Sequence, residues 1–217
     1  MVARRLKAYD YKVYVTGPFQ AGKTTLIHTL DPDAISVERD LKEPYRGEKS
    51  TTTTGFDLGR VVWARKEIGH DGLIIPKKEF EREKDEYDGW IVKDIELRGV
   101  PGQLHFKFVR DTMRANTDGV LMIIDSSDYG MVGDASAILA ETQAAFGDIP
   151  LEVIANKQDR PDAASPEQVA TWLGVPHATG MCAKNRESAK SALGMLLKKI
   201  ETAAGAALAQ GAATASV

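Results

Sequence analysis

The sequence predicts an α/β fold, in which helices cover both faces of a mostly parallel sheet. Segments suited to strands alternate along the chain with amphipathic segments suited to helices. Residues 119–125, GVLMIID, form a continuous apolar run, which is typical of a strand buried on both faces. Near the end of the chain, five apolar side chains share one helical face and predict a final helix packed on the sheet. They are Ala189, Leu193, Leu196, Leu197 and Ile200.

The earlier elements follow in order. Residues 11–17, YKVYVTG, place Val13 and Val15 in alternation and end in glycine, which predicts a strand and then a sharp turn. Residues 23–30, KTTLIHTL, have helical character and stop at an Asp-Pro pair. Further strand-like segments are GRVVWA (59–64), IVKDIELRG (91–99) and LEVIANK (151–157).

Length and composition indicate a soluble globular protein. The chain has 217 residues, 43% of them hydrophobic and 27% charged, so we expect one domain over residues 1–202. A net charge of −3 provides no general basic surface for nucleic acid. One cysteine cannot form an internal disulfide, which favours a reducing compartment. Because no signal sequence, lipidation motif or long apolar run is visible, we expect a cytoplasmic location without a direct membrane anchor.

Two segments differ from this pattern. Residues 65–89 are charged and interrupted by Gly and Pro, which favours an exposed hairpin extension or loop over a surface for a partner protein. Residues 203–217, AAGAALAQGAATASV, could prolong the last helix a little. Their low complexity and glycines favour a frayed or disordered tail.

Residues 17–24, GPFQAGKT, fit the phosphate-binding pattern G-x-x-x-x-G-K-[ST] between a strand and a helix. The glycines allow a tight turn, and successive backbone N–H groups with the helix N-terminus form a nest for an anion. Lys23 would bring an ammonium to the terminal phosphates, and the Thr24 hydroxyl can ligate Mg²⁺. The predicted phosphate-binding residues are Gly17, Pro18, Phe19, Gln20, Ala21, Gly22, Lys23, Thr24 and Thr25. We call them the cradle.

A second motif, NKQD at residues 156–159, follows a strand and matches the N-K-x-D of GTP-binding proteins. A carboxylate at Asp159 can accept hydrogen bonds from the ring N–H and the amino group of guanine, whereas adenine would leave it unpaired. Lys157 can lay its stem along the ring, and Asn156 can connect neighbouring loops. The motif therefore indicates a guanine site at the carboxyl end of the sheet.

CAK at residues 182–184 stands where GTPases carry S-A-K, so the Ala183 N–H would face the guanine carbonyl, with Cys182 in place of serine and Lys184 after it. With these motifs in order, the chain resembles the Ras-like small GTPases from about residue 11 to 200. TGPFQAGKTT and GVPGQLHFKFV are most similar to prokaryotic small GTPases related to the Arf and gliding-motility branches. The resemblance implies a six-stranded sheet with five helices, with residues 65–89 inserted in the interswitch hairpin, and a molecular switch.

The resemblance also implies a threonine that closes over Mg²⁺ and the γ-phosphate. TTGF in EKSTTTTGFDLGR is similar to the T-I-G-F of Arf proteins, which selects Thr53, with Thr52 as the alternative. The hydroxyl would ligate the metal and the N–H would touch the phosphate, so that losing the phosphate releases the loop. The alternative is that these threonines have no switch role and occur here because threonine favours β-strands.

The family's D-x-x-G-Q turn corresponds to GVPGQ at residues 99–103. The resemblance implies that Gly102 offers its N–H to the γ-phosphate and that Gln103 orients the attacking water. Gly99 stands where the family has an aspartate that holds Mg²⁺ through a water. We interpret Gly99 as a feature of this branch and expect Gly99→Asp to tighten Mg²⁺ binding.

Four other residues also bear on this site. Asp125 could replace the missing aspartate, although a structural role is favoured. Phe19 stands where Ras proteins have glycine and would crowd an incoming arginine finger. Arg39 and Arg46 could act in cis, but solvated surface arginines are favoured.

The expected function is a switch that binds GTP and GDP with Mg²⁺, hydrolyses GTP slowly, and signals through partner proteins that contact the segments around Thr53 and Gln103. Gln103, Lys23 and Thr53 are the expected catalytic residues, with Thr24 and Thr53 as metal ligands. Two alternatives stay open. One is a GTP-binding scaffold that does not hydrolyse, and the other is a P-loop kinase of a small metabolite.

Overall fold

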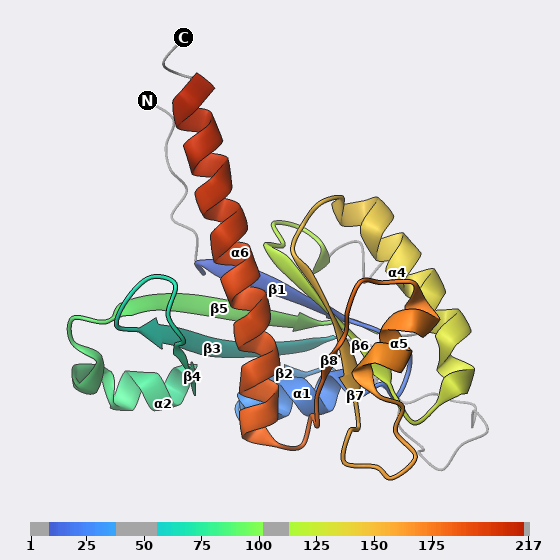
Figure 1. Cartoon of the computed structure of the whole chain (residues 1–217). Helices are drawn as coiled ribbons and strands as arrows, with labels where there is room; N and C mark the ends of the chain where they lie inside the picture. The colour runs from blue at the N-terminus through green and yellow to red at the C-terminus, as the bar shows by residue number, and fades with distance from the viewer. Residues whose placement is uncertain (1–8, 38–55, 102–112, 215–217) are drawn as a thin grey trace.

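A computed structural model describes residues 9–37, 56–101 and 113–214, with the side chains of the last helix described as far as residue 206 (Figure 1). Eight strands form one sheet in the order β2-β3-β5-β1-β6-β7-β8, and β4 pairs with β3 beside β2. The pairs from β5 to β8 are parallel, whereas β3 is antiparallel to β2, β4 and β5. The strands are β1 (Tyr11–Thr16), β2 (Ile35–Ser36), β3 (Asp57–Arg65), β4 (Leu73–Pro76), β5 (Ile91–Gly99), β6 (Gly119–Asp125), β7 (Leu151–Asn156) and β8 (Thr179–Gly180).

The α/β class with a mostly parallel sheet is confirmed, but the described part of the sheet has eight strands where six were predicted. The two additional strands, β2 and β4, are short and pair along the outer edge of β3. They use backbone groups that a sheet edge would otherwise leave without strand partners.

Five α-helices lie in the described residues, as the resemblance implied. They are α1 (Lys23–Leu30), α2 (Lys77–Arg82), α4 (Val132–Phe146), α5 (Pro166–Leu173) and α6 (Arg186–Thr214). Short 3₁₀ turns, η1 (Lys84–Tyr87) and η3 (Tyr129–Met131), precede β5 and α4. Among the described residues, no helix is long and apolar enough to cross a bilayer.

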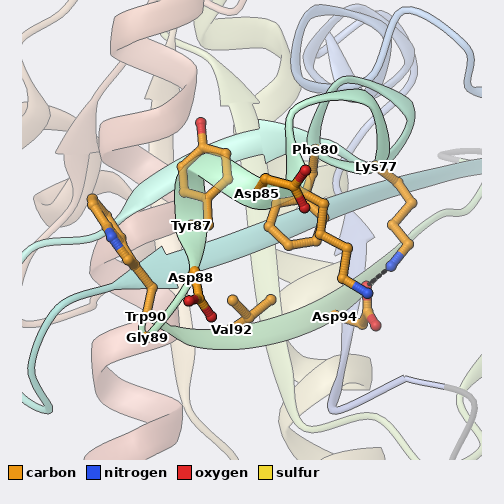
Figure 2. A pocket seen from close by; sticks show the side chains of 10 residues that line it. Lys77, Phe80, Asp85, Tyr87, Asp88, Gly89, Trp90, Val92 and Asp94 are labelled. Carbon is orange, nitrogen blue, oxygen red and sulfur yellow. Dashed lines mark hydrogen bonds and ion pairs between the residues drawn. The ribbon is translucent and has the colours of Figure 1, made fainter.

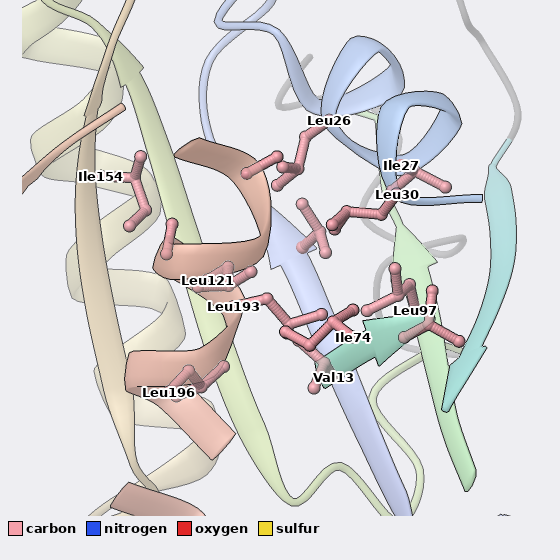
Figure 3. Packing of buried hydrophobic residues seen from close by; sticks show 14 of the residues in the cluster. Val13, Leu26, Ile27, Leu30, Ile74, Leu97, Leu121, Ile154, Leu193 and Leu196 are labelled. Carbon is pink, nitrogen blue, oxygen red and sulfur yellow. The ribbon is translucent and has the colours of Figure 1, made fainter. Parts of the chain in front are cut away.

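One face of the sheet packs against α1 and α6 (Figure 3). Leu26, Ile27 and Leu30 of α1 meet the odd-numbered side chains of the central strands, and the predicted apolar face of α6 is buried along its whole length. The opposite face of β6 and β7 packs against α4 and α5. Because strand side chains alternate between faces, β6 can be apolar throughout, as its uninterrupted sequence predicted.

The helix ends follow local sequence. α1 begins after Gly22, whose φ of 105° favours glycine, and ends at Leu30, before an Asp-Pro pair. Ser165 and Gln168 form a capping box at the start of α5, with Pro166 at its first position. These boundaries place the turns that precede α1 and follow β7 at one edge of the sheet.

The insertion is more structured than the sequence indicated. β3 and β5 form a long hairpin that pairs Asp57 with Gly99 and Arg65 with Ile91. Residues 66–90 then add β4 to the sheet edge and fold α2 back over β3, where Phe80 packs on Val62, Ala64 and Ile75. The predicted hairpin extension is therefore correct, and the structure adds a small apolar core between the extension and β3.

The carboxyl-terminal segment also differs from its prediction. α6 continues through the alanine-rich residues to Thr214, where fraying or disorder after residue 202 was expected, and it projects beyond the sheet (Figure 1). Residues 203–206 are exposed. Alanine has the highest helix propensity, so a helix already anchored by its buried part propagates into this segment.

Candidate functional site

The predicted site residues that the structure describes converge at the carboxyl edge of the parallel strands. The cradle follows β1, the NKQD motif follows β7, and CAK follows β8. Parallel strands bring their carboxyl ends to the same edge of a sheet, where open α/β sheets bind ligands. The three motifs are far apart in the chain, and the sheet brings them together.

The cradle adopts a turn that requires glycine. Gly17 has a φ of 137° and Gly22 a φ of 105°. A Cβ at Gly17 would lie 1.9 Å from the carbonyl oxygen of Ile123 on β6, so no other residue fits there. No side chain of the described residues caps the N-terminus of α1. The amides of the first turn are therefore suited to an anion.

Lys23 is buried, and its ammonium bridges the cradle. Nζ donates to the carbonyl oxygens of Gly17 at 2.9 Å and Pro18 at 2.6 Å. Burial lowers the pKa of Lys23 to about 8, and the charge of Asp57 partly opposes that effect. The side chain therefore remains mostly cationic at pH 7 and can neutralise phosphate oxygens at the loop.

Thr24 points its hydroxyl at a carboxylate that the sequence did not single out. Thr24 Oγ1 donates to Oδ2 of Asp57 at 2.8 Å, and Ser36 Oγ donates to Oδ1 at 2.5 Å. His28 Nε2 lies 2.7 Å from the same serine oxygen. Asp57 is the first residue of β3, so this chain of hydrogen bonds connects α1, β2 and β3.

Gly99, where the family has an aspartate, lies directly opposite Asp57 in the hairpin. A Cβ at Gly99 would lie 3.0 Å from both Cβ and Oδ2 of Asp57 and 2.6 Å from Cδ1 of Ile27. A side chain at position 99 would therefore be in close contact with both residues. A second carboxylate at position 99 would add a like charge beside Asp57, so the expectation that Gly99→Asp tightens Mg²⁺ binding stays a prediction.

Asn156 connects the cradle to the CAK loop. Its Nδ2 donates to the Ala21 carbonyl at 2.8 Å, and its Oδ1 accepts from the Ala183 N–H at 2.9 Å. The side chain is buried. A single amide thus holds the phosphate-binding loop and the predicted guanine-binding loops in one arrangement.

Lys157 and Asp125 form an ion pair at the ends of β7 and β6. Burial, the largest single influence on the Asp125 pKa, raises it, but the hydrogen bonds from Lys157 and Ser127 together outweigh burial and hold the pKa below its usual value. These contacts favour the structural interpretation of Asp125. Asp159, two residues beyond Lys157, is exposed at the same edge.

The CAK loop is ordered by its own contacts. Cys182 is half-buried, and its N–H donates to Ser188 Oγ at 3.0 Å. Ala183 is buried against Asn156, while Lys184 is exposed. Phe19, in the cradle, is partly exposed.

Several predicted residues lie outside the described part of the chain. They are Thr52, Thr53, Gly102, Gln103, Arg39 and Arg46. Their roles stay predictions.

Asp57 is the functional candidate that sequence reasoning missed. Two signals were available, because Asp57 follows the threonine run directly and Gly99 lacks the family carboxylate. What was missing was the hairpin register, which pairs these two residues.

A pocket of about 630 Å³ lies away from these motifs, on the insertion (Figure 2). Phe80, Tyr87 and Trp90 line it, and Lys77 and Asp94 form an ion pair at its edge. Its residues come from α2, η1, the turn of residues 88–90 and β5, so it is separate from the cradle.

A glycine-rich turn between a parallel strand and a helix, with a buried lysine and a threonine hydroxyl, defines a P-loop nucleotide-binding domain. Residues 66–201, more than half of the chain, match the ADP-ribosylation factor (Arf) family. The chain belongs to this family and is a GTP-binding small GTPase of the Arf type. Members bind GTP and GDP with Mg²⁺, hydrolyse GTP and bind regulators and effectors. The match begins after the cradle, so the geometry of the cradle supports the assignment separately.

Proposed function

We propose that this chain is a guanine-nucleotide switch that binds GTP and GDP in the cradle, hydrolyses GTP slowly, and signals through proteins that bind its GTP state. One observation carries the proposal: Asn156 joins the cradle to the CAK loop through two hydrogen bonds. The phosphate-binding and base-binding motifs therefore lie next to each other at one edge of the sheet. Family membership favours this function over a metabolite kinase.

The described residues of the cradle are suited to binding Mg²⁺ together with a nucleotide. In the described residues no cluster of three or more His, Cys, Asp or Glu side chains could hold a metal ion. Phosphate oxygens are ligands that Mg²⁺ takes when it binds with a nucleotide. Thr24 offers a hydroxyl oxygen beside a carboxylate. Mg²⁺ supplies charge neutralisation on the phosphates, and Lys23 adds a second cation at the same loop.

The remaining roles rest on the resemblance. Thr53, or Thr52 as the alternative, closes over the γ-phosphate as a metal ligand, Gly102 donates its N–H, and Gln103 orients water. Turnover is slow because no arginine finger is evident in the sequence. Within the family, the similarity of the cradle and of residues 99–109 favours the prokaryotic branch related to gliding-motility GTPases.

Base selectivity tests the proposal directly. A fluorescent GDP analogue bound to the wild-type protein should be displaced by GDP but not by similar concentrations of ADP. Asp159→Asn replaces one acceptor with a donor, so GDP affinity should fall at least about a hundredfold. Xanthosine diphosphate, which has a carbonyl in place of the guanine amino group, should bind to Asp159→Asn more tightly than it binds to wild type. Asp162→Asn, an exposed aspartate paired with Arg160 in the same loop, is the matched control and should change neither affinity.

Hydrolysis separates a switch from a scaffold. In single-turnover assays with GTP and Mg²⁺, Gln103→Leu should release phosphate at least about tenfold more slowly than wild type, because the attacking water loses its orienting amide. Phosphate release that does not depend on Gln103, with or without cell extract, favours the scaffold. Proteins retained only by GTP-analogue-loaded chain, and not by GDP-loaded chain, are the expected effectors.

A further inference from the structure

The pocket on the insertion is bordered by three aromatic rings from three short segments (Figure 2). Phe80 belongs to α2, Tyr87 to η1, and Trp90 to the turn before β5. The ring centroids of Phe80 and Tyr87 lie 5.3 Å apart, and those of Tyr87 and Trp90 lie 5.5 Å apart at an interplanar angle of 84°. Rings that meet at an angle around one space resemble the aromatic cages that hold organic cations.

The packing of the insertion holds these rings in place before any ligand binds. Phe80 is only 5% exposed and packs on Val62 and Ala64 of β3, so it anchors the pocket to the sheet. Tyr87 and Trp90 are half-buried against the same cluster. A preformed pocket costs less free energy to occupy, because fewer side chains have to be ordered on binding.

The segment that forms the pocket is strongly acidic. Residues 79–88 contain six carboxylates and two cationic side chains. Asp85 and Asp88 line the pocket, and neither forms an ion pair within the part of the chain that the structure describes. Burial raises the pKa of Tyr87, and the negative charge of Glu83 and other nearby glutamates raises it further. The surroundings of the pocket therefore favour a cation.

Two lysines line the pocket but do not cancel its negative charge. Lys77 is paired with Asp94 at 2.5 Å, so these two charges compensate each other. Lys84 is exposed and is the only cation left against the two unpaired carboxylates among the residues that line the pocket. A net negative charge remains.

Two of the three rings already have a cation of this chain nearby. Lys66 Nζ lies 5.3 Å from the centroid of Trp90, and Lys77 Nζ lies 5.7 Å from that of Phe80. Tyr87, which contacts both rings, has no such cation among the residues that the structure describes. The position over Tyr87 is therefore the one open to a cation from outside.

We propose that this pocket binds an arginine side chain from an exposed basic segment of a partner protein, with the guanidinium stacked on Tyr87 and paired with Asp85 and Asp88. Arginine suits the site better than lysine, because a planar guanidinium can stack on a ring and donate to two carboxylates. The chain already contains such an arrangement, since the guanidinium of Arg65 lies 3.8 Å from the centroid of Trp63 and pairs with a carboxylate of α6. The pocket is separate from the cradle, so the proposal does not depend on nucleotide binding.

Nuclear magnetic resonance of the indole N–H groups tests this site, because the chain has three tryptophans and only Trp90 lines the pocket. The probe is the peptide acetyl-Gly-Arg-Gly-Arg-Gly-amide, titrated into the isotope-labelled full chain. The Trp90 signal should shift with a dissociation constant below about 1 mM, while the signals of Trp63 and Trp172 stay in place. The same peptide with citrulline in place of arginine keeps the shape but loses the charge, and it should bind at least about tenfold more weakly.

Variants at exposed positions separate this site from a general effect of charge. Asp85→Asn combined with Asp88→Asn removes both carboxylates and should weaken binding of the arginine peptide at least about tenfold. Glu67→Gln combined with Asp71→Asn is the matched control, because it removes the same charge from exposed residues of the insertion that do not line the pocket. Its affinity should stay within about twofold of wild type. Lys84→Gln removes a competing cation and should tighten binding by about threefold.

Three results would overturn the proposal. The first is equal affinity for the arginine and citrulline peptides, or an equal loss in the two double variants. The second is weaker binding by Lys84→Gln, which would indicate a site for an anion. The third concerns residues 1–8, which carry three cationic side chains and lead to Asp10, whose N–H donates to the carbonyl of Asp94 at 2.9 Å. If deleting residues 2–8 strengthens peptide binding by about tenfold or more, the occupant is this segment rather than a partner, whereas an affinity within about threefold of the full chain supports the proposal.

Discussion

At the level of single residues, Asn156 belongs to a base-recognition motif and also connects two loops. It is buried, and its amide uses a donor and an acceptor at once, one toward Ala21 and one toward Ala183. A Cβ at Gly22 would lie 2.3 Å from its Nδ2, so the cradle and this side chain fit closely. The amide therefore links the phosphate-binding loop directly to the CAK loop.

Asn156→Ala removes both hydrogen bonds and leaves a buried carbonyl and a buried N–H unpaired. We expect a loss of about 2 kcal/mol in the free energy of unfolding and an increase of about tenfold or more in the GDP release rate. Thermal unfolding and release of a fluorescent GDP analogue measure the two effects. Ser188→Ala, which removes only the single bond to the Cys182 N–H in the same loop, should have a clearly smaller effect on both. Equal effects would mean that Asn156 does not couple the two loops.

At the level of elements, one ion pair ties the interswitch hairpin to the last helix. Arg65, the last residue of β3, directs both terminal guanidinium nitrogens at the two carboxylate oxygens of Glu201 on α6. Its guanidinium carbon lies 3.8 Å from the centroid of the Trp63 ring. The guanidinium is fully buried, and its Nε has no hydrogen-bond partner among the residues that the structure describes. The insertion therefore depends on a helix from the opposite end of the chain.

Glu201→Gln should lower the free energy of unfolding by about 2 kcal/mol at pH 7, because it leaves the Arg65 charge buried and uncompensated. The hydrogen bond from Arg65 lowers the pKa of Glu201 below its ordinary 4.5, although burial opposes it. A lowered carboxyl pKa stabilises the fold above the ordinary value, and the stabilisation is lost as pH falls through the folded-state pKa. The difference in unfolding free energy between wild type and variant should therefore begin to shrink below about pH 4.5 and disappear as pH falls through the folded-state pKa.

Urea unfolding across pH measures this difference. Asp71→Asn is the matched control, since Asp71 is exposed and pairs with Lys198 on the same helix. Exposed pairs add little stability, so the control should unfold like wild type at every pH. A Glu201→Gln deficit that persists unchanged at low pH would contradict the assigned role of the ion pair.

At the level of the whole molecule, α6 has a buried part and a projecting part. Ile200 completes the core that α6 shares with α1 and the sheet, and Lys199 donates to the buried Glu152 at 2.6 Å. Residues 203–206 are exposed, and the helix extends past the sheet beyond them (Figure 1). The stability of the domain should therefore depend on α6 only as far as Glu201.

Two truncations test this division. Deleting residues 203–217 should change the melting temperature by less than about 2 °C, because it removes exposed surface. Deleting residues 199–217 removes Ile200, Lys199, which pairs with Glu152, and Glu201, which pairs with Arg65. This deletion should lower the melting temperature by about 10 °C or more. Similar melting temperatures for the two truncated proteins would contradict the division.

Features that depend on residues adjacent in the chain could be predicted from the sequence, and features that depend on contacts between distant residues could not. The cradle, the end of α1 before its Asp-Pro pair and the strand of residues 119–125 are contiguous patterns, and the structure has each where it was expected. The extent of the insertion's order was not predictable, because Phe80 packs on residues of β3 and β4 that precede it in the chain. The helix beyond residue 202 was predictable from alanine propensity, but its glycines argued against it.

The sequence by itself determined the class of the fold, the phosphate-binding turn and the guanine-recognition motif, because each depends on residues that are neighbours in the chain. The tertiary structure decided which carboxylate lies beside Thr24 at the end of the cradle. That choice depends on the register of β3 against β5, which places Asp57 across from Gly99 and within reach of Thr24. A glycine that looked like a lost aspartate is thus the space that another aspartate needs.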